Sequence, residues 1–509
     1  MTSANITMIV VIALYMAMMI VVGAICSKKN KNSDDFYLGG RKLGVWVTAM
    51  SAEASDMSSW LLMGLPGVAL LAGLAEATWT ALGLAVGTYV NWLIVARRLR
   101  NYTQRIDAFT IPDFFSRRFH EDKKILNAIA SLVIIVFFVP YTASGFNACG
   151  TLFSSLFGVD YFWAMLISAI VIVIYTSLGG FLAASTTDLI QSIIMTIALI
   201  VVVFFGINYA GGWANVAENA KALPSYLSLT STYDVASGGT APYNGLTIAS
   251  TMAWGLGYFG MPHILLRFMA IENPAKLTRC RRIASVWVTI SMAIAILIGV
   301  IGYSITKNGY IATMTSSVES QRIIVEISKL ISQNGVLFAC IAGLILAGIL
   351  ASTMSTSDSQ LLAAASSVSQ NLLQDVFHVK LSDKASMLIA RLTVFAIAIV
   401  GVLWAKDEGS VFSIVAFAWA GFGASFGPVV LFSLFWKRTT RWGALAGMIV
   451  GGAMVFIWKY GIAKLGGLFA IYELLPAFVL ACIAIVVVSL LTPAPDAEVV
   501  KEYEEVKAM

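Results

Sequence analysis

The most constraining feature of the sequence is an apolar segment, from about Val45 to Gly73, that carries two carboxylates near its middle. The segment is long enough to cross a bilayer. A carboxylate at membrane depth is costly, so Glu53 and Asp56 indicate a functional site. The Ser, Asp and Gly residues around them weaken the helix, and unwound backbone survives in a membrane only where it lines a cavity or is buried in protein. Such an interrupted helix is typical of the cation and substrate sites of secondary transporters. The alternative is a buried polar kink that only packs.

The composition places most of the chain in a membrane. Of its 509 residues, 59% are hydrophobic and only 12% are charged, whereas soluble domains average about 25% charged. The net charge of +6 does not indicate nucleic-acid binding, because the basic residues fall in short loops between apolar runs. The three histidines and five cysteines are widely dispersed, which argues against a resident metal centre or a disulfide framework. No nucleophile–base constellation appears, so we expect neither an enzyme nor an organic cofactor.

The hydropathy pattern predicts an all-α polytopic membrane protein with about thirteen membrane helices. The first apolar run lacks the basic start and the small-residue cleavage site of a signal peptide, so we expect it to be a retained helix. The runs cover approximately residues 6–26, 46–73, 75–96, 125–157, 160–180, 186–208, 243–265, 284–305, 335–365, 387–405, 411–436, 442–462 and 468–491.

The distribution of basic residues predicts the orientation. Most of the 33 Lys and Arg residues fall in alternate loops, which the positive-inside rule places in the cytoplasm. With an odd number of helices, the N-terminus then lies outside and the C-terminus lies in the cytoplasm. Neither of the longest polar stretches, 97–124 and 209–242, has the size of a soluble domain, and the tail 492–509 is mixed-charge. We therefore expect one membrane transport domain over 1–509 that ends in a frayed cytoplasmic tail.

A weak internal symmetry divides this domain. The second run is interrupted at SDMSSW, and the seventh run, five helices later, is interrupted at Trp254–His263, where glycine and proline are frequent. Interrupted helices at corresponding places in two halves indicate a transporter binding site. We therefore predict a five-plus-five inverted repeat, with 46–208 and 243–436 as its halves. Helix 6–26 and helices 442–491 are then extra helices at the two ends.

Three hydroxyl residues in the ninth run predict a cation site. Ser352, Ser355 and Thr356 lie at i, i+3 and i+4 and so share one helix face. Hydroxyls and backbone carbonyls are hard oxygen donors, which suit a small hard cation beside an opened helix. The alternative is that these hydroxyls bond back to their own helix or pack against a neighbouring one. The broken second run favours the cation site.

Aromatic residues at the second break predict a solute pocket. Trp254 and Tyr258 share a helix face, and the intervening glycines and the following Pro262 allow the backbone to open. Aromatic rings beside free backbone groups suit a small zwitterion with an apolar body. Tyr141, which follows the kinking Pro140, is a weaker candidate for the same pocket. The alternative for the aromatic pair is an interfacial belt, although a belt does not need the glycines.

Two charges at the cytoplasmic ends of helices suggest a gate. Arg41 lies in LGGRKLG before the second run, and Asp188 follows GGFLAASTT before the sixth. A salt bridge between Arg41 and Asp188 could close the inner side of the protein. The alternative is that both are solvated charges that contribute little to stability.

Several sequence blocks, in order along nearly the whole chain, resemble the sodium:solute symporter family. They are FYLGGRKLG, SDMSSWLLMGLPG, YTSLGGFLA, WGLGYFGMPHILLRFMA, MSTSDSQLL, AWAGFGASFGPVVLFSLFW and KRTTRWGALAGM. The likeness is strongest to members that transport proline. The resemblance implies a LeuT-like inverted-repeat core and sodium-coupled import of L-proline across a bacterial cell membrane. It implies membrane lipid around the protein, and neither nucleic acid nor an obligate protein partner.

The resemblance also implies site residues. Sodium, the only metal expected, is implied at Ala54, Met57, Ser352, Ser355 and Thr356, with Asp56 as the essential acidic residue beside them. Substrate contacts are implied at Ser58, Tyr141, Trp254, Tyr258 and Pro262. Some positions depart from the family pattern: Glu53 and Ser59 stand in place of glycine, Ser352 in place of alanine, and Asp358 adds a carboxylate. These departures leave the ion stoichiometry and any proton role open.

Other functions are also compatible with the pattern. Within the family, the solute could be pantothenate or a sugar. An uncoupled channel or facilitator is a second class, but ion channels usually repeat a pore motif or assemble around one, and no such repeat is visible. A transporter-like sensor needs a signalling domain, which we do not expect in this chain.

Overall fold

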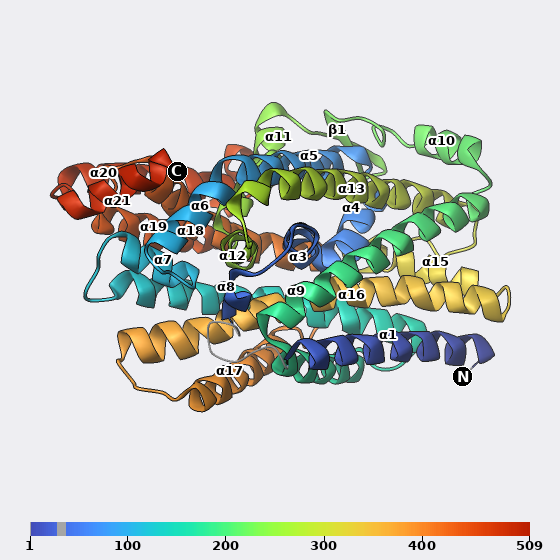
Figure 1. Cartoon of the computed structure of the whole chain (residues 1–509). Coiled ribbons are helices and arrows are strands. Elements are labelled where there is room, and N and C mark those ends of the chain that lie inside the picture. Colours follow the sequence, from blue (N-terminus) through green and yellow to red (C-terminus); the bar gives the residue numbers. More distant parts are fainter. Residues whose placement is uncertain (1, 28–36) are drawn as a thin grey trace.

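Helices dominate the structure. The computed structural model describes residues 2–27 and 37–509, and its long helices run side by side as one bundle (Figure 1). Within these residues, ten helices are long and apolar enough to cross a membrane. The predicted apolar runs lie mostly on helical backbone, so the prediction of an all-α polytopic membrane protein is confirmed.

The helices of the first half are α1 (Ser3–Ser27), α3 (Val45–Ser59), α4 (Leu65–Ala72), α5 (Leu74–Val90), α6 (Ala96–Arg105), α7 (Ile111–Arg118), α8 (Ile125–Phe157) and α9 (Tyr161–Tyr209). Those of the second half are α10 (Trp213–Ala222), α11 (Gly245–Met252), α12 (Pro262–Ala270), α13 (Leu277–Lys307), α14 (Ser317–Ser320), α15 (Ile323–Ser332), α16 (Val336–Ser366), α17 (Asp383–Trp404), α18 (Val411–Phe435), α19 (Arg441–Tyr460), α20 (Leu474–Leu491) and α21 (Ala497–Ala508). Short 3₁₀ or π turns connect them: η1 (Gly39–Arg41), η2 (Trp60–Gly64), η3 (Asn91–Val95), η4 (Ala253–Gly260), η5 (Pro274–Lys276), η6 (Ser367–Val376), η7 (Ile462–Leu465) and η8 (Gly467–Phe469).

The predicted break in the second run is confirmed. The regular path of α3 stops at Ser58, whose φ of 47° and ψ of −170° are not helical. Positive φ is uncommon for a residue other than glycine and stores strain, which persists only where the surroundings impose it. The π turn η2 then leads into α4. The backbone groups around Ser58 therefore leave the regular helical ladder two residues after Asp56.

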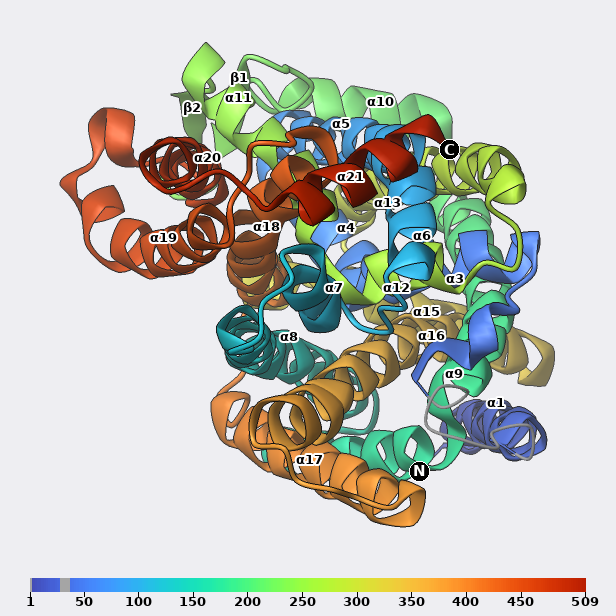
Figure 2. The same ribbon diagram turned by 60° about the vertical axis from the view of Figure 1, so that its left-hand side comes forward.

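The predicted break in the seventh run is also confirmed. After the 3₁₀ segment η4, Met261 is extended, with φ −75° and ψ 107°, and Pro262 begins α12. A Cβ atom on Gly255 of η4 would lie 2.2 Å from the carbonyl oxygen of Gly83 in α5. Only glycine therefore allows the broken segment to pack directly against α5. The helices on the two breaks, α3 and α12, contact each other near the centre of the bundle (Figures 1 and 2).

Two predicted boundaries differ from the structure. The runs 160–180 and 186–208 form one element, α9, which is interrupted only at Gly180, where φ is 67° and ψ is −178°. A glycine can reverse the backbone within one residue, so no separate polar turn is needed there. The polar segment 209–242 is also not a plain loop: it contains α10 and an antiparallel hairpin of β1 (Ser231–Asp234) and β2 (Gly239–Pro242).

The prediction of a frayed C-terminal tail is wrong. The tail forms α21, which lies across α6 (Figure 2). Val499, Tyr503 and Val506, at i, i+4 and i+7, are buried. On its polar side, Glu505 pairs with Arg105 at 3.0 Å. The amphipathic spacing explains why the segment docks although its composition is mixed-charge.

Candidate functional site

Two tyrosines donate hydrogen bonds to Asp56, just before the break in α3. The Tyr141 hydroxyl donates to the backbone carbonyl oxygen of Asp56 at 3.2 Å, and the Tyr258 hydroxyl donates to its carboxylate oxygen Oδ2. Tyr141 lies on α8, directly after Pro140, and Tyr258 lies on η4. Asp56 therefore joins both broken segments and α8 at one buried point.

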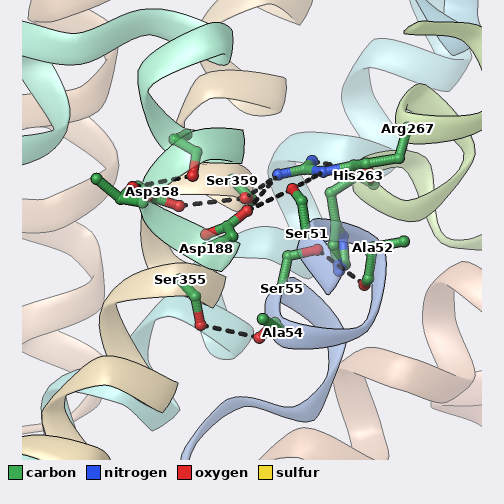
Figure 3. Close-up of polar contacts among 12 residues, drawn as sticks. Ser51, Ala52, Ala54, Ser55, Asp188, His263, Arg267, Ser355, Asp358 and Ser359 are labelled. Atoms are coloured by element: carbon green, nitrogen blue, oxygen red, sulfur yellow. Dashed lines mark hydrogen bonds and ion pairs between the residues drawn. The ribbon is translucent and has the colours of Figure 1, made fainter. Parts of the chain in front are cut away.

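The predicted cation face of α16 meets α3. The Ser355 hydroxyl donates to the carbonyl oxygen of Ala54 at 2.8 Å (Figure 3) and lies 3.2 Å from the carbonyl oxygen of Ser352. The structure thus brings Ala54 together with a hydroxyl from the other half of the chain. The hydroxyl of Thr356 instead bonds back to Ser352 at 3.2 Å, and that of Ser352 bonds back to Ile349 at 2.7 Å, as in the alternative interpretation.

A small buried cavity lies beside Asp56. Its volume is about 10 Å³, which is space for about one water molecule. The lining residues are Asp56, Met57, Trp60, Leu84, Tyr141, Trp254, Val415 and Trp419. The predicted residues Asp56, Met57, Tyr141 and Trp254 therefore share one cavity. Ser58 and Pro262 do not line it; they lie at the break of α3 and at the start of α12.

Aromatic rings cluster around Trp254, on the side of the cavity where Trp60 lies. The ring centroids of Trp60 and Trp254 are 5.6 Å apart, and those of Trp254 and Tyr472 are 5.3 Å apart. Phe412 lies 5.4 Å from Trp254. We call these four residues the aromatic layer. Trp254 is only 4% exposed, so the alternative of a membrane-interface belt is wrong for it.

A buried ion pair lies on the opposite side of Asp56. On α3, Ser51 lies one to two turns before Asp56, and its hydroxyl donates to Asp188 Oδ2 at 2.6 Å. Arg267 on α12 pairs with the same carboxylate oxygen at 3.1 Å and also donates to the hydroxyls of Ser51 and Ser359 (Figure 3). Asp188 and Arg267 are almost completely buried. The alternative of a solvated charge is therefore wrong for Asp188.

The predicted partner of Asp188 differs from the observed one. Arg41 donates to the carbonyl oxygens of Ala108 at 2.7 Å and Met269 at 2.9 Å, and no Arg41–Asp188 pair forms within the described residues. The sequence offered a signal for Arg267, because it is a single basic residue within the apolar run PHILLRFMA. Its position at the end of that run made it resemble a residue of the cytoplasmic loop.

The two extra carboxylates are also buried. Glu53 Oε1 accepts a hydrogen bond from the indole nitrogen of Trp92 at 2.9 Å, and Oε2 has no hydrogen-bond partner. Asp358 Oδ1 accepts from the hydroxyl of Ser359 at 3.1 Å, which links it to Arg267 (Figure 3). Neither Trp92 nor Ser359 was predicted to belong to the site.

Comparison with known proteins identifies the family. The sequence model of the sodium:solute symporter family matches residues 36–451. The chain belongs to this family. It is thus a multi-pass membrane transporter that couples solute movement to sodium, and not an enzyme.

Full-length relatives agree with this assignment. The osmoregulated proline transporter OpuE of Bacillus subtilis strain 168 is 41% identical over 494 residues, which cover 96% of this chain and 96% of the relative. The sodium/proline symporter of Escherichia coli strain K12 is 41% identical over 503 residues, which cover 98% of this chain and 96% of the relative.

Solved structures of distant sequence share the fold. A Na⁺-coupled sialic acid symporter, in a substrate-bound outward-open state, has a TM-score of 0.77 at 18% identity and covers 96% of this chain and 99% of its own. MhsT in complex with L-phenylalanine has a TM-score of 0.56 at 12% identity and covers 88% of this chain and 98% of its own. These likenesses confirm the predicted LeuT-like fold class.

Proposed function

We propose that the protein imports L-proline together with sodium by alternating access. Relatives that are 41% identical over almost the whole chain are named as proline transporters. The observation that carries the proposal within the structure is the contact of the broken α3 with the hydroxyl face of α16, made by Ser355 and Ala54. A transporter of a small zwitterion and a small cation needs such a junction of two elements at mid-membrane.

Sodium binds, in this proposal, at the junction of α3 and α16. The backbone oxygens of Ala54 and Met57 and the oxygens of Ser352, Ser355 and Thr356 form its ligand set, and Asp56 supplies negative charge nearby. The contact of Ser355 with Ala54 O at 2.8 Å supports this assignment, because a cation between these two oxygens replaces one hydrogen bond with two ion–oxygen contacts. Hard oxygen donors of this kind suit small hard cations.

Proline binds next to Asp56 against the aromatic layer. Its ring packs on Trp254, and its secondary amine lies near the Asp56 carboxylate or an aromatic face, as a cation–π contact. The backbone at Ser58, assisted by the positive end of the half-helix that η2 and α4 form after it, meets the carboxylate of proline. Because the cavity now measures about 10 Å³, it must widen to accept the solute.

The buried pair of Asp188 and Arg267 is the inner gate in this proposal. It lies on the side of Asp56 away from the aromatic layer, since Ser51 and Trp60 flank Asp56 on α3. The inner gate faces the cytoplasm, with the N-terminus outside and the C-terminus inside. The two ends of the chain lie at opposite ends of the bundle (Figure 1), which supports an odd number of membrane crossings. The positions of the basic residues support the same orientation.

Uptake into proteoliposomes tests the solute. Purified protein is reconstituted, and uptake of labelled L-proline is measured with and without an inward sodium gradient, against excess unlabelled proline, pantothenate, glucose and other amino acids. We expect sodium-dependent uptake that only unlabelled proline and its close analogues suppress. Uptake of pantothenate or glucose in place of proline contradicts the solute assignment while leaving the family assignment intact.

A further inference from the structure

We propose that Glu53 forms a second sodium site with Thr88 and Asn91, one helical turn before Asp56, so that the protein binds two sodium ions. The inference deepens the proposed function and depends on it for the first sodium ion at Ser355. It does not depend on the identity of the solute.

The first observation is an incompletely satisfied carboxylate. Glu53 is 1% exposed. Its Oε1 accepts one hydrogen bond, from Trp92 at 2.9 Å, while Oε2 has no partner. Among the ion pairs of the described residues, none involves Glu53 or Asp56. A buried carboxylate is normally paired, hydrogen-bonded on both oxygens or bound to a metal ion, so Oε2 is an open ligand position.

The second observation comes from the helix that faces Glu53. Thr88, Asn91 and Trp92 lie at i, i+3 and i+4 on the continuous segment of α5 and η3, and so point to the same side. Trp92 contacts Glu53 of α3 and Asn91 contacts Tyr258 of η4, so this side of the segment lies where α3 and η4 meet. The oxygens Thr88 Oγ1 and Asn91 Oδ1 are both buried without a hydrogen-bond partner.

The chemistry of this set selects a small monovalent cation. A carboxylate, an amide carbonyl and a hydroxyl are hard oxygen donors, and all three have free acceptor positions. No cysteine or histidine contributes, so a soft transition metal is not favoured. The site carries one negative charge of its own, which one sodium ion neutralises.

The charges of the whole site favour this second cation when both carboxylates are ionised. Glu53 and Asp56 lie at i and i+3 on α3, and both are buried. One sodium ion at Ser355 balances only one of the two carboxylates. A second ion at Glu53 balances the other and removes the repulsion between them.

Tyr258 couples the second site to the solute pocket. Its carbonyl oxygen accepts a hydrogen bond from Asn91 Nδ2 at 3.0 Å, and its hydroxyl donates to Asp56. An ion that binds Asn91 Oδ1 therefore also restrains Tyr258, which donates a hydrogen bond to the Asp56 carboxylate beside the proposed solute site. Sodium at Glu53 consequently favours the arrangement of Tyr258 seen here.

Equilibrium binding of ²²Na⁺ to the purified full-length protein, without any solute, tests the inference. We compare the wild type with Glu53→Gln, Ser355→Ala and the control Glu218→Gln, whose carboxylate is exposed on α10. The wild type and the control should bind two ions with a Hill coefficient above one, and Glu53→Gln should bind one ion with a coefficient near one. Ser355→Ala should lower the affinity for one ion, while the other ion should still bind in a way that depends on Glu53.

Two outcomes overturn the inference. One is binding of a single ion to the wild type, and the other is binding of two ions to Glu53→Gln. If Glu53→Gln does not fold, Thr88→Val removes one oxygen at nearly constant volume and should weaken only one of the two ions by about fivefold or more, on the scale of typical coupling energies. Unchanged binding of both ions by Thr88→Val overturns the proposal as well. Absence of all sodium binding in the wild type refutes the proposed function itself.

Discussion

Replacing Ser355 by alanine tests the junction between α3 and α16. The Ser355 side chain is fully buried, and its hydroxyl reaches the carbonyl oxygen of Ala54 at 2.8 Å. The substitution removes one of five proposed sodium ligands with little change in volume. Loss of such a ligand weakens binding by about 1–3 kcal/mol, or about 5- to 150-fold in affinity. The sodium concentration for half-maximal proline uptake should rise by this factor.

The matched control is Thr353→Val on the same helix. Thr353 is equally buried, but its hydroxyl bonds back to Ile349 at 3.0 Å within α16. Ser359, one helical turn after Ser355, is not a suitable control because Arg267 donates a hydrogen bond to its hydroxyl. Initial rates of uptake are measured over a sodium series at equal amounts of reconstituted protein. An unchanged half-saturation in Ser355→Ala, or an equal rise in Thr353→Val, refutes the sodium assignment.

Four further substitutions follow from the site. Asp56→Asn should remove most sodium-driven uptake; normal sodium dependence at normal expression contradicts the role of Asp56. Trp254→Ala and Tyr258→Ala should raise the proline concentration for half-maximal uptake more than the sodium concentration, and the reverse order speaks against the aromatic pocket. Arg267→Ala leaves the carboxylate of Asp188 buried and unpaired, and breaking a buried pair in this way costs about 3–5 kcal/mol. A large drop in unfolding temperature in detergent should follow, and a near-wild-type value argues against the pair as a structural lock.

The sequence predicted the elements that have strong local causes. Long apolar runs predict membrane helices because lipid cannot satisfy a free backbone. The break at Ser58 was visible from the Ser, Asp and Gly residues around it, and the break before Pro262 from its glycines. The hydroxyl face with Ser355 followed from helical spacing alone.

The parts that the sequence did not predict depend on tertiary contacts. No local sequence feature indicates which arginine pairs with Asp188, because Arg267 reaches that carboxylate only after α12 packs beside α3. The pairing of Glu53 with Trp92 joins separate helices in the same way. The mixed charge of the C-terminal tail does not indicate docking, and its buried face, with Tyr503 and its apolar neighbours at helical spacing, becomes evident only once α21 packs on α6.

Concentrative uptake tests the central claim of sodium–proline coupling most directly. Proteoliposomes receive equal labelled proline on both sides and an inward sodium gradient as the only driving force. The account predicts that internal proline rises above the external concentration and returns to equality when the sodium gradient is collapsed. Internal proline that stays equal to the external concentration despite the gradient, in proteoliposomes that exchange proline at the same rate with and without it, contradicts coupled symport and indicates an uncoupled facilitator.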